Sequence, residues 1–317
     1  MLQLIQKLFR NPALQRHRRL RQMRAGRLSD LQSSLPNTTC VDVGASYYPH
    51  TSWWIFLESS NTTWIAVEPN ENNLTYVKNW PWPASIETVT KGLSKKGGEQ
   101  ILYVTNVDSG SSLLRPVVQP SMSFRTTAEV EKYFFPVREV TIETVTLVDV
   151  VSKLPHQPMI VKLDTQGSEL SILESVLEGE ARDNLVGVEI ECSLLAKPYY
   201  EDSPRLWDVA KIMESNGFEA IDIDVIPRSA AKSKISSHPK QIVNECDAVF
   251  ALRPDVASTK SPEMRAALLG FYVTNCFYAE AARSLDHDPQ LLQYLESRGC
   301  NVARLRSELR TRSNKAR

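Results

Sequence analysis

Residues 160–169 read IVKLDTQGSE, and this stretch carries the strongest indication of the fold. An apolar, β-branched run meets a glycine and then a helical pattern, which is typical of a strand that turns into a helix in an α/β sheet. Strand alternation places Lys162 and Asp164 on one face. Because lysine is rarely buried without a partner, we expect Lys162 to pair with a carboxylate of the next strand, most simply Glu189. Asp164 and Glu191 would then lie near the strand ends beside a ligand crevice, and the alternative is an ion-pair network that only supports the sheet.

Outward from this stretch, short β-branched runs alternate with helical patterns from about residue 38 to 252. This alternation predicts an α/β fold with a mostly parallel sheet. The last two runs are joined by a polar loop without a helix, so the final strand is expected to be antiparallel. Residues 98–145 interrupt the alternation and are expected to form an elaboration on one face. The expected strands are 39–43, 64–68, 86–89, 160–164, 185–191, 219–224 and 248–252, with helices near 52–58, 71–79, 167–178 and 204–216.

The pattern divides the chain of 317 residues into a basic helical arm over 1–36, an α/β domain over 37–254 and a helical C-terminal extension over 255–317. No apolar run approaches the roughly 18 residues that a membrane-spanning helix needs. The start of the chain lacks the features of a signal peptide. The five cysteines are scattered without a CxxC pair, which argues against a zinc site or a disulfide framework and predicts a reduced, cytoplasmic protein.

The 37 basic and 37 acidic side chains are unevenly distributed along the sequence. Residues 1–30 carry a net charge of +7 and residues 298–317 a net charge of +6, so the middle of the chain carries −13. The basic ends are compatible with peripheral contact to an anionic membrane surface, or they are solvated helices. Nucleic acid is not an expected partner.

Two further motifs indicate a nucleotide-like ligand. Residues 41–46 read VDVGAS, a strand that runs into a turn with the single glycine Gly44. This is not the G-x-G-x-x-G pattern of an NAD site, but it suits the amino-acid portion of S-adenosylmethionine, with Asp42 organising the turn; a tight packing turn is the alternative. The next strand ends at Glu68, where a carboxylate can accept hydrogen bonds from ribose hydroxyls, or can merely cap a turn.

In order, VDVGA at 41–45, VEPN at 67–70, SGSSL at 109–113, KLDTQGSE at 162–169 and DAVF at 247–250 resemble the FkbM family of methyltransferases. The resemblance implies a class I methyltransferase (Rossmann-like) fold, S-adenosyl-L-methionine as the donor, and a hydroxyl acceptor on a glycan or other small metabolite. The chain departs from the family pattern at Tyr48, where a second glycine usually follows the first.

Together these motifs define the expected site. An alcohol needs a general base to become a nucleophile, and Asp164 is the first choice for this role, followed by Glu191, His50 and His238. No metal site is indicated, although a Mg²⁺ ion held by Asp164 and Glu191 is an alternative way to acidify the hydroxyl. The basic loop 228–240 is a contact for an anionic acceptor or a solvated loop. The donor-binding candidates are Asp42, Gly44, Ala45, Ser46, Glu68, Pro69, Asn70, Gly92, Leu93 and Asp164.

The sequence thus predicts an S-adenosylmethionine-dependent O-methyltransferase that acts on a hydroxyl of a glycan or related metabolite. The alternative is a catalytically silent binding or scaffold protein on the same fold. Tyr48 in the donor turn favours the alternative, whereas the intact Glu68 and Asp164 favour the enzyme.

Overall fold

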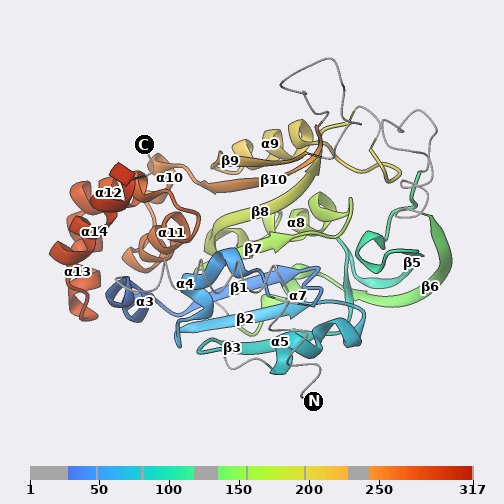
Figure 1. The fold of residues 1–317 in the computed structure, drawn as a ribbon, viewed down its shortest axis with the longest axis horizontal. Helices are drawn as coiled ribbons and strands as arrows, with labels where there is room; N and C mark the ends of the chain where they lie inside the picture. The colour runs from blue at the N-terminus through green and yellow to red at the C-terminus, as the bar shows by residue number, and fades with distance from the viewer. Residues whose placement is uncertain are drawn as a thin grey trace, which may run out of the picture.

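The computed structural model describes residues 28–47, 49–79, 82–117, 135–154, 156–195, 198–227 and 243–315. A central sheet runs through the molecule, with a cluster of C-terminal helices at one end and a smaller sheet at the other (Figure 1). Residues 1–27 of the expected basic arm, Tyr48, and the loop 228–242 with His238 lie outside the described residues.

The central sheet has seven strands in the order β3-β2-β1-β7-β8-β10-β9. All neighbouring strands are parallel except β10, which is antiparallel to both β8 and β9. The expected class I methyltransferase arrangement with an antiparallel last strand is therefore confirmed. Its strands are β1 Thr38–Val43, β2 Thr62–Val67, β3 Ser85–Val89, β7 Met159–Leu163, β8 Leu185–Ser193, β9 Phe218–Pro227 and β10 Val243–Leu252.

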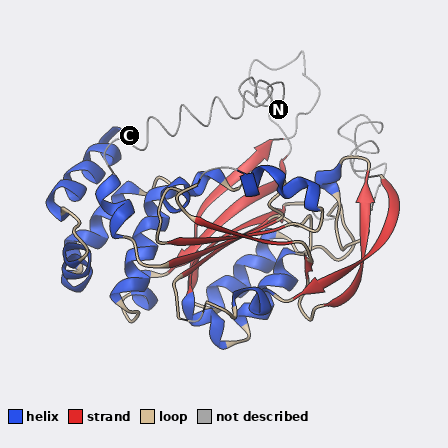
Figure 2. Cartoon of the chain, turned by 90° about the horizontal axis from the view of Figure 1, so that it is seen from below, coloured by secondary structure: helices blue, strands red, loops and turns tan. Residues whose placement is uncertain are grey.

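Helices lie on both sides of these strands (Figure 2). The helices expected near 52–58 and 71–79 are present, and each begins as a 3₁₀ turn rather than as a regular helix. The central strands β1, β7 and β8 are buried almost throughout, as expected for parallel strands covered on both faces, whereas the edge strand β3 is partly exposed. The helical elements between the strands are η1 Thr51–Trp53, α4 Trp54–Leu57, η2 Glu71–Leu74, α5 Thr75–Asn79, α7 Leu147–Val151, α8 Glu169–Leu177, η5 Glu180–Asn184 and α9 Leu206–Ser215.

The elaboration forms a second sheet of β4 Gly92–Leu93, β6 Pro136–Val145 and β5 Gly98–Thr105, in that order. We expected this segment on one face of the central sheet, and that expectation was wrong. Side chains from it, including Leu102 and Ile142, instead line a cleft at the carboxyl ends of the central strands. The short helix η3 Asp108–Gly110 follows β5 and lines the same cleft.

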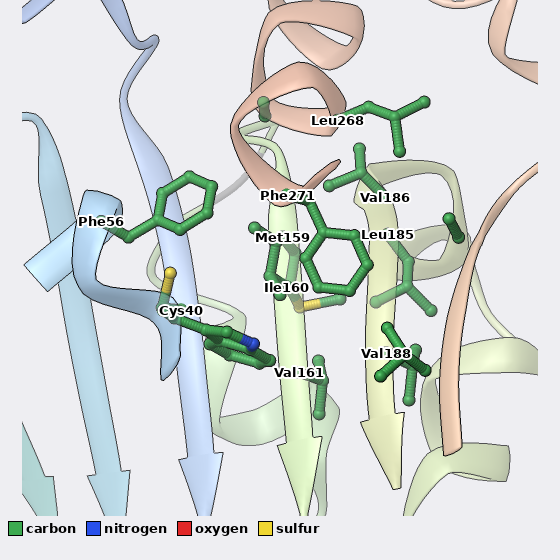
Figure 3. Close-up of a cluster of buried hydrophobic side chains, with 14 of the residues drawn as sticks. Cys40, Phe56, Met159, Ile160, Val161, Leu185, Val186, Val188, Leu268 and Phe271 are labelled. Atoms are coloured by element: carbon green, nitrogen blue, oxygen red, sulfur yellow. The ribbon is translucent and has the colours of Figure 1, made fainter. Parts of the chain in front are cut away.

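The C-terminal helices share the core of the central sheet. Phe271 packs edge-on to Trp53 with ring centroids 6.1 Å apart. Its ring also occupies the space that any side chain larger than hydrogen at position 187 would need, which accounts for Gly187. Figure 3 shows Phe271 and Leu268 against the buried side chains of β7 and β8. The C-terminal helices are α10 Pro254–Ala257, α11 Pro262–Thr274, α12 Tyr278–His287, α13 Pro289–Ser297 and α14 Val302–Lys315.

The charges near the C-terminus are largely used within the fold. Arg298 donates to the backbone carbonyls of Ser34 and Leu35 at the end of α3 (Ser29–Ser34), which ties the start of the described chain to the C-terminal helices. On α14, Arg306 and Arg310 both pair with Asp286 of α12. Within the described ranges, no helix has the length and apolar character needed to cross a membrane.

Candidate active site

A cleft of about 250 Å³ opens at the carboxyl ends of the parallel strands, where α/β sheets generally bind ligands. Because β1 lies between β2 and β7, Glu68 after β2 and Asp164 after β7 stand on opposite sides of the turn at Gly44. Glu191 on β8 lies one strand beyond Asp164. The sheet order therefore brings together three carboxylates that are far apart in the sequence.

Gly44 is required by the close approach of two chain segments. Its φ is +80°, and an added Cβ would lie 2.0 Å from the backbone carbonyl oxygen of Asp164. Its backbone N–H donates to the carbonyl of Val67 (2.9 Å), so the turn after β1 is held against the ends of both β2 and β7. The glycine thus serves as a packing turn and at the same time forms part of the cleft wall.

Glu68 and Asp108 form an acidic corner of the cleft. The Asn70 backbone N–H donates to Glu68 Oε1 (2.8 Å), and the Asn73 side chain donates to Asp108 Oδ2 (2.7 Å). Burial raises the pKa of Glu68, and the nearby Asp108 charge adds to the effect. The sequence reasoning missed Asp108 and Asn73. Asp108 directly precedes the SGSSL block, and this position was the available signal.

Lys162 pairs with different carboxylates from the one we expected. Its Nζ lies 3.2 Å from Asp164 Oδ2 and 3.8 Å from Asp42 Oδ1, and the described structure contains no ion pair between Lys162 and Glu189. Glu189 does neighbour Lys162 in the β7–β8 register, but its carboxylate accepts hydrogen bonds from His50 Nε2 (2.9 Å) and Trp53 Nε1 (3.1 Å). The expected pairing was therefore wrong, because ring donors from the segment after β1 occupy that carboxylate.

His50 and Asp42 lie behind the cleft rather than on its lining. Asp42 is 1% exposed and accepts the backbone N–H of His50 at Oδ2 (2.7 Å). Burial disfavours the charged form of His50, but the Glu189 carboxylate outweighs burial and raises the pKa of the imidazole. Ala45 is also buried outside the lining.

Gln166 connects Asp164 with Glu191. Its Nε2 donates to Asp164 Oδ1 (3.1 Å) and to Glu191 Oε2 (2.6 Å). Burial opposes the charge of Asp164, but Lys162 and the Gln166 amide outweigh it and hold the pKa of Asp164 below its usual value. Burial, together with the neighbouring Asp164 charge, raises the pKa of Glu191 well above its usual value. The two neighbouring carboxyl groups are thus pushed towards opposite protonation states.

Glu169 holds the loop between β7 and α8. Both of its carboxylate oxygens accept the backbone N–H of Gly167 (2.9 Å each), and Oε1 also accepts the N–H of Thr165 (2.8 Å). The side chain is 2% exposed, and burial raises its pKa to about 7. Glu169 therefore fixes the backbone that carries Asp164 and Gln166.

Most of the expected donor-binding residues lie on the cleft. The Ser46 hydroxyl oxygen is buried there and has no hydrogen-bond partner in the described structure, which suits a polar ligand group. The described residues contain no group of three or more His, Cys, Asp or Glu placed to hold a metal ion. The lining includes Gly44, Ser46, Glu68, Pro69, Asn70, Gly92, Leu93 and Asp164.

A family model described as "Methyltransferase FkbM domain" matches residues 42–220. No curated protein matches the chain significantly. Among solved structures, the chain is similar to precorrin-6y C5,15-methyltransferase from Geobacter metallireducens, at 13% identity over 71% of this chain and 87% of that chain, with a TM-score of 0.30. It is also similar to the plantazolicin methyltransferase BpumL in complex with SAH, at 8% identity over 78% of this chain and 93% of that chain, with a TM-score of 0.31.

Proposed function

This chain belongs to the FkbM family of S-adenosylmethionine-dependent methyltransferases, and we propose that it methylates a hydroxyl oxygen of a glycan or related metabolite. The observation that carries the proposal is the Asp164 carboxylate, which lies on the wall of a cleft at the carboxyl edge of the sheet and pairs with Lys162. When bound, S-adenosylmethionine would supply an electrophilic methyl group on a positively charged sulfur.

The donor would be held by the residues around Gly44 and Glu68. Glu68 has one carboxylate oxygen fixed by the Asn70 N–H, and the cleft exposes the group to accept hydrogen bonds from ribose hydroxyls. The buried Ser46 hydroxyl offers a further polar contact near the Gly44 turn. Gly92 and Leu93 supply a wall without charge on the same cleft.

Asp164 is the proposed general base. A base must hold a lone pair, and the pKa of Asp164, held below its usual value by Lys162 and the Gln166 amide, favours its ionised form. The raised pKa of Glu191 favours the protonated form of this second carboxyl group. Asp164 would therefore take the proton of the acceptor hydroxyl as the oxygen gains its methyl group. In its protonated form, Glu191 would donate a hydrogen bond beside it.

The charges around the cleft favour an acceptor that is not anionic. Asp164, Glu68 and Asp108 line the cleft, and Lys91, the one cation among its described lining residues, already pairs with Glu143. Vicinal hydroxyls of a sugar donate hydrogen bonds to carboxylates, so a neutral glycan suits this lining better than an acidic one.

The test begins with donor binding and ends with transfer. Calorimetry should detect binding of S-adenosylmethionine by the full chain and no binding of NAD. Glu68→Ala should weaken donor binding about ten- to a hundredfold, since charge-assisted hydrogen bonds contribute about 1.5–3 kcal/mol. Glu71→Ala, on the exposed first turn after β2, is the matched control and should bind as the parent does.

A transfer assay then separates the acceptor classes. Label from methyl-labelled S-adenosylmethionine should reach neutral glycans in preference to amine-bearing or acidic ones. Transfer confined to amines would contradict O-methylation. Donor binding without transfer to any acceptor in a broad panel would favour the silent binding protein.

A further inference from the structure

We infer that Gln166 is a positioning residue whose side-chain amide holds Asp164 and Glu191 in place and keeps their roles distinct. The inference rests on the proposed function in that it concerns the same two carboxyl groups. An amide nitrogen carries two hydrogens, and the geometry uses one for each carboxyl group: 3.1 Å to Asp164 Oδ1 and 2.6 Å to Glu191 Oε2.

The orientation of the amide is set from its other end. The Tyr200 hydroxyl lies 2.9 Å from Gln166 Oε1 and 2.8 Å from the Gly110 carbonyl oxygen, so its single hydrogen is shared between these two acceptors. With its oxygen facing Tyr200, the amide turns its NH₂ group towards the two carboxyl groups. Tyr200 is 4% exposed, so this anchor is itself held by the packed interior.

The backbone of Gln166 is constrained as well. Its φ is +61°, a conformation that side-chain-bearing residues seldom adopt, and the Ser112 hydroxyl donates to its carbonyl (2.8 Å). The neighbouring Gly167 N–H is bound by Glu169. Such a backbone persists only where the surrounding contacts hold it, and strained positions of this kind gather at functional sites.

The amide acts among several charges that face the two carboxyl groups. Lys162 on β7 pairs with Asp164, and Asp42 on β1 lies beyond it. Glu169 on α8 and the β10 side chains Glu245 and Asp247 contribute negative charge around Glu191. Among these acids, Gln166 gives Asp164 a neutral donor on the side away from Lys162. Its loss therefore removes a contact that favours the ionised form of Asp164, and raises the pKa of that group.

The experiment measures the carboxyl groups directly in the full-length protein. Carbon-13 labelling of Asp and Glu carboxyl carbons allows titration by NMR, with the Asp164 and Glu191 signals assigned from Asp164→Asn and Glu191→Gln. In Gln166→Met, which keeps the side-chain length but has no donor, the Asp164 midpoint should rise by about one pH unit or more. Gln166→Glu should raise it further because it adds a third carboxylate, and Tyr200→Phe should raise it less. Gln157→Met, the same change at the opposite edge of the sheet, is the control and should leave the midpoint unchanged.

The outcomes separate this inference from the proposed function. An unchanged Asp164 midpoint in folded Gln166→Met and Gln166→Glu would overturn the positioning role, whatever the parent binds. If Gln166→Met fails to fold, an unchanged midpoint in Gln166→Glu and Tyr200→Phe has the same meaning. Failure of the parent to bind S-adenosylmethionine in calorimetry would instead count against the proposed function and leave the titration result standing.

Discussion

Lys162→Met tests the charge arrangement beneath the site. The Lys162 side chain is 13% exposed and stands between Asp164 and the 1%-exposed Asp42. Removing the ammonium leaves Asp42 with one hydrogen bond, from the His50 backbone, and with Oδ1 unpartnered in the described structure. Breaking a buried pair by removing one partner costs about 3–5 kcal/mol. For a domain of this size, the melting temperature should therefore fall by about 6–20 °C.

The pH dependence of the loss identifies its cause. Burial already raises the pKa of Asp42 and Lys162 opposes that rise, so Lys162→Met should raise this pKa further. An acid whose pKa is higher in the folded state than in the unfolded state stabilises the fold only while it is protonated. Its contribution to the unfolding free energy is complete below the unfolded-state pKa and is lost as the pH rises through the folded-state pKa. The difference in unfolding free energy between parent and variant should thus be large near pH 8 and should shrink towards pH 4.

Urea unfolding at several pH values provides the measurement. Lys95→Met removes a lysine from an exposed pair with Glu174 and Glu178, and should change the unfolding midpoint far less. The double variant Lys162→Met with Asp42→Asn should recover much of the loss, because it removes the stranded charge. The buried charge arrangement described above is refuted if Lys162→Met unfolds at the same urea concentration as the parent at pH 8. It is also refuted if the loss of unfolding free energy in this variant does not depend on pH.

Two further predictions concern the cleft itself. Asp164→Asn should lower turnover by about 10²–10⁴ while leaving S-adenosylmethionine affinity within a few-fold, as checked by steady-state rates and calorimetry; loss of parent activity on adding a chelator would instead point to a metal ion. Gly44→Ala should cost more than about 2 kcal/mol in urea unfolding, since its Cβ would meet the Asp164 backbone. Gly299→Ala shares the positive φ but has open space around the added Cβ, so equal losses in the two variants would show that the close approach at Gly44 is not the cause.

The sequence predicted the parts of the site that depend on local pattern. Alternation within the 160–164 run placed Asp164 at the end of its strand, and the loop without a helix before β10 indicated the antiparallel strand. The acid after β2 was found in the same way, because the carboxyl ends of parallel strands meet at one edge. Each of these inferences needs only the period of a strand and the direction in which it runs.

The partners of the buried charges were decided by tertiary structure alone. Lys162 lies beside Glu189 in the register, yet Glu189 bonds to His50 and Trp53, whose rings reach it from a segment about 139 residues earlier in the chain. Gln166 stands inside the most specific motif, but its importance appears only when Tyr200 and Glu191 are seen on either side of its amide. Periodicity determines which face of a strand a residue occupies. The direction in which a long side chain extends, and the group it meets, depend on the paths of loops from distant parts of the chain.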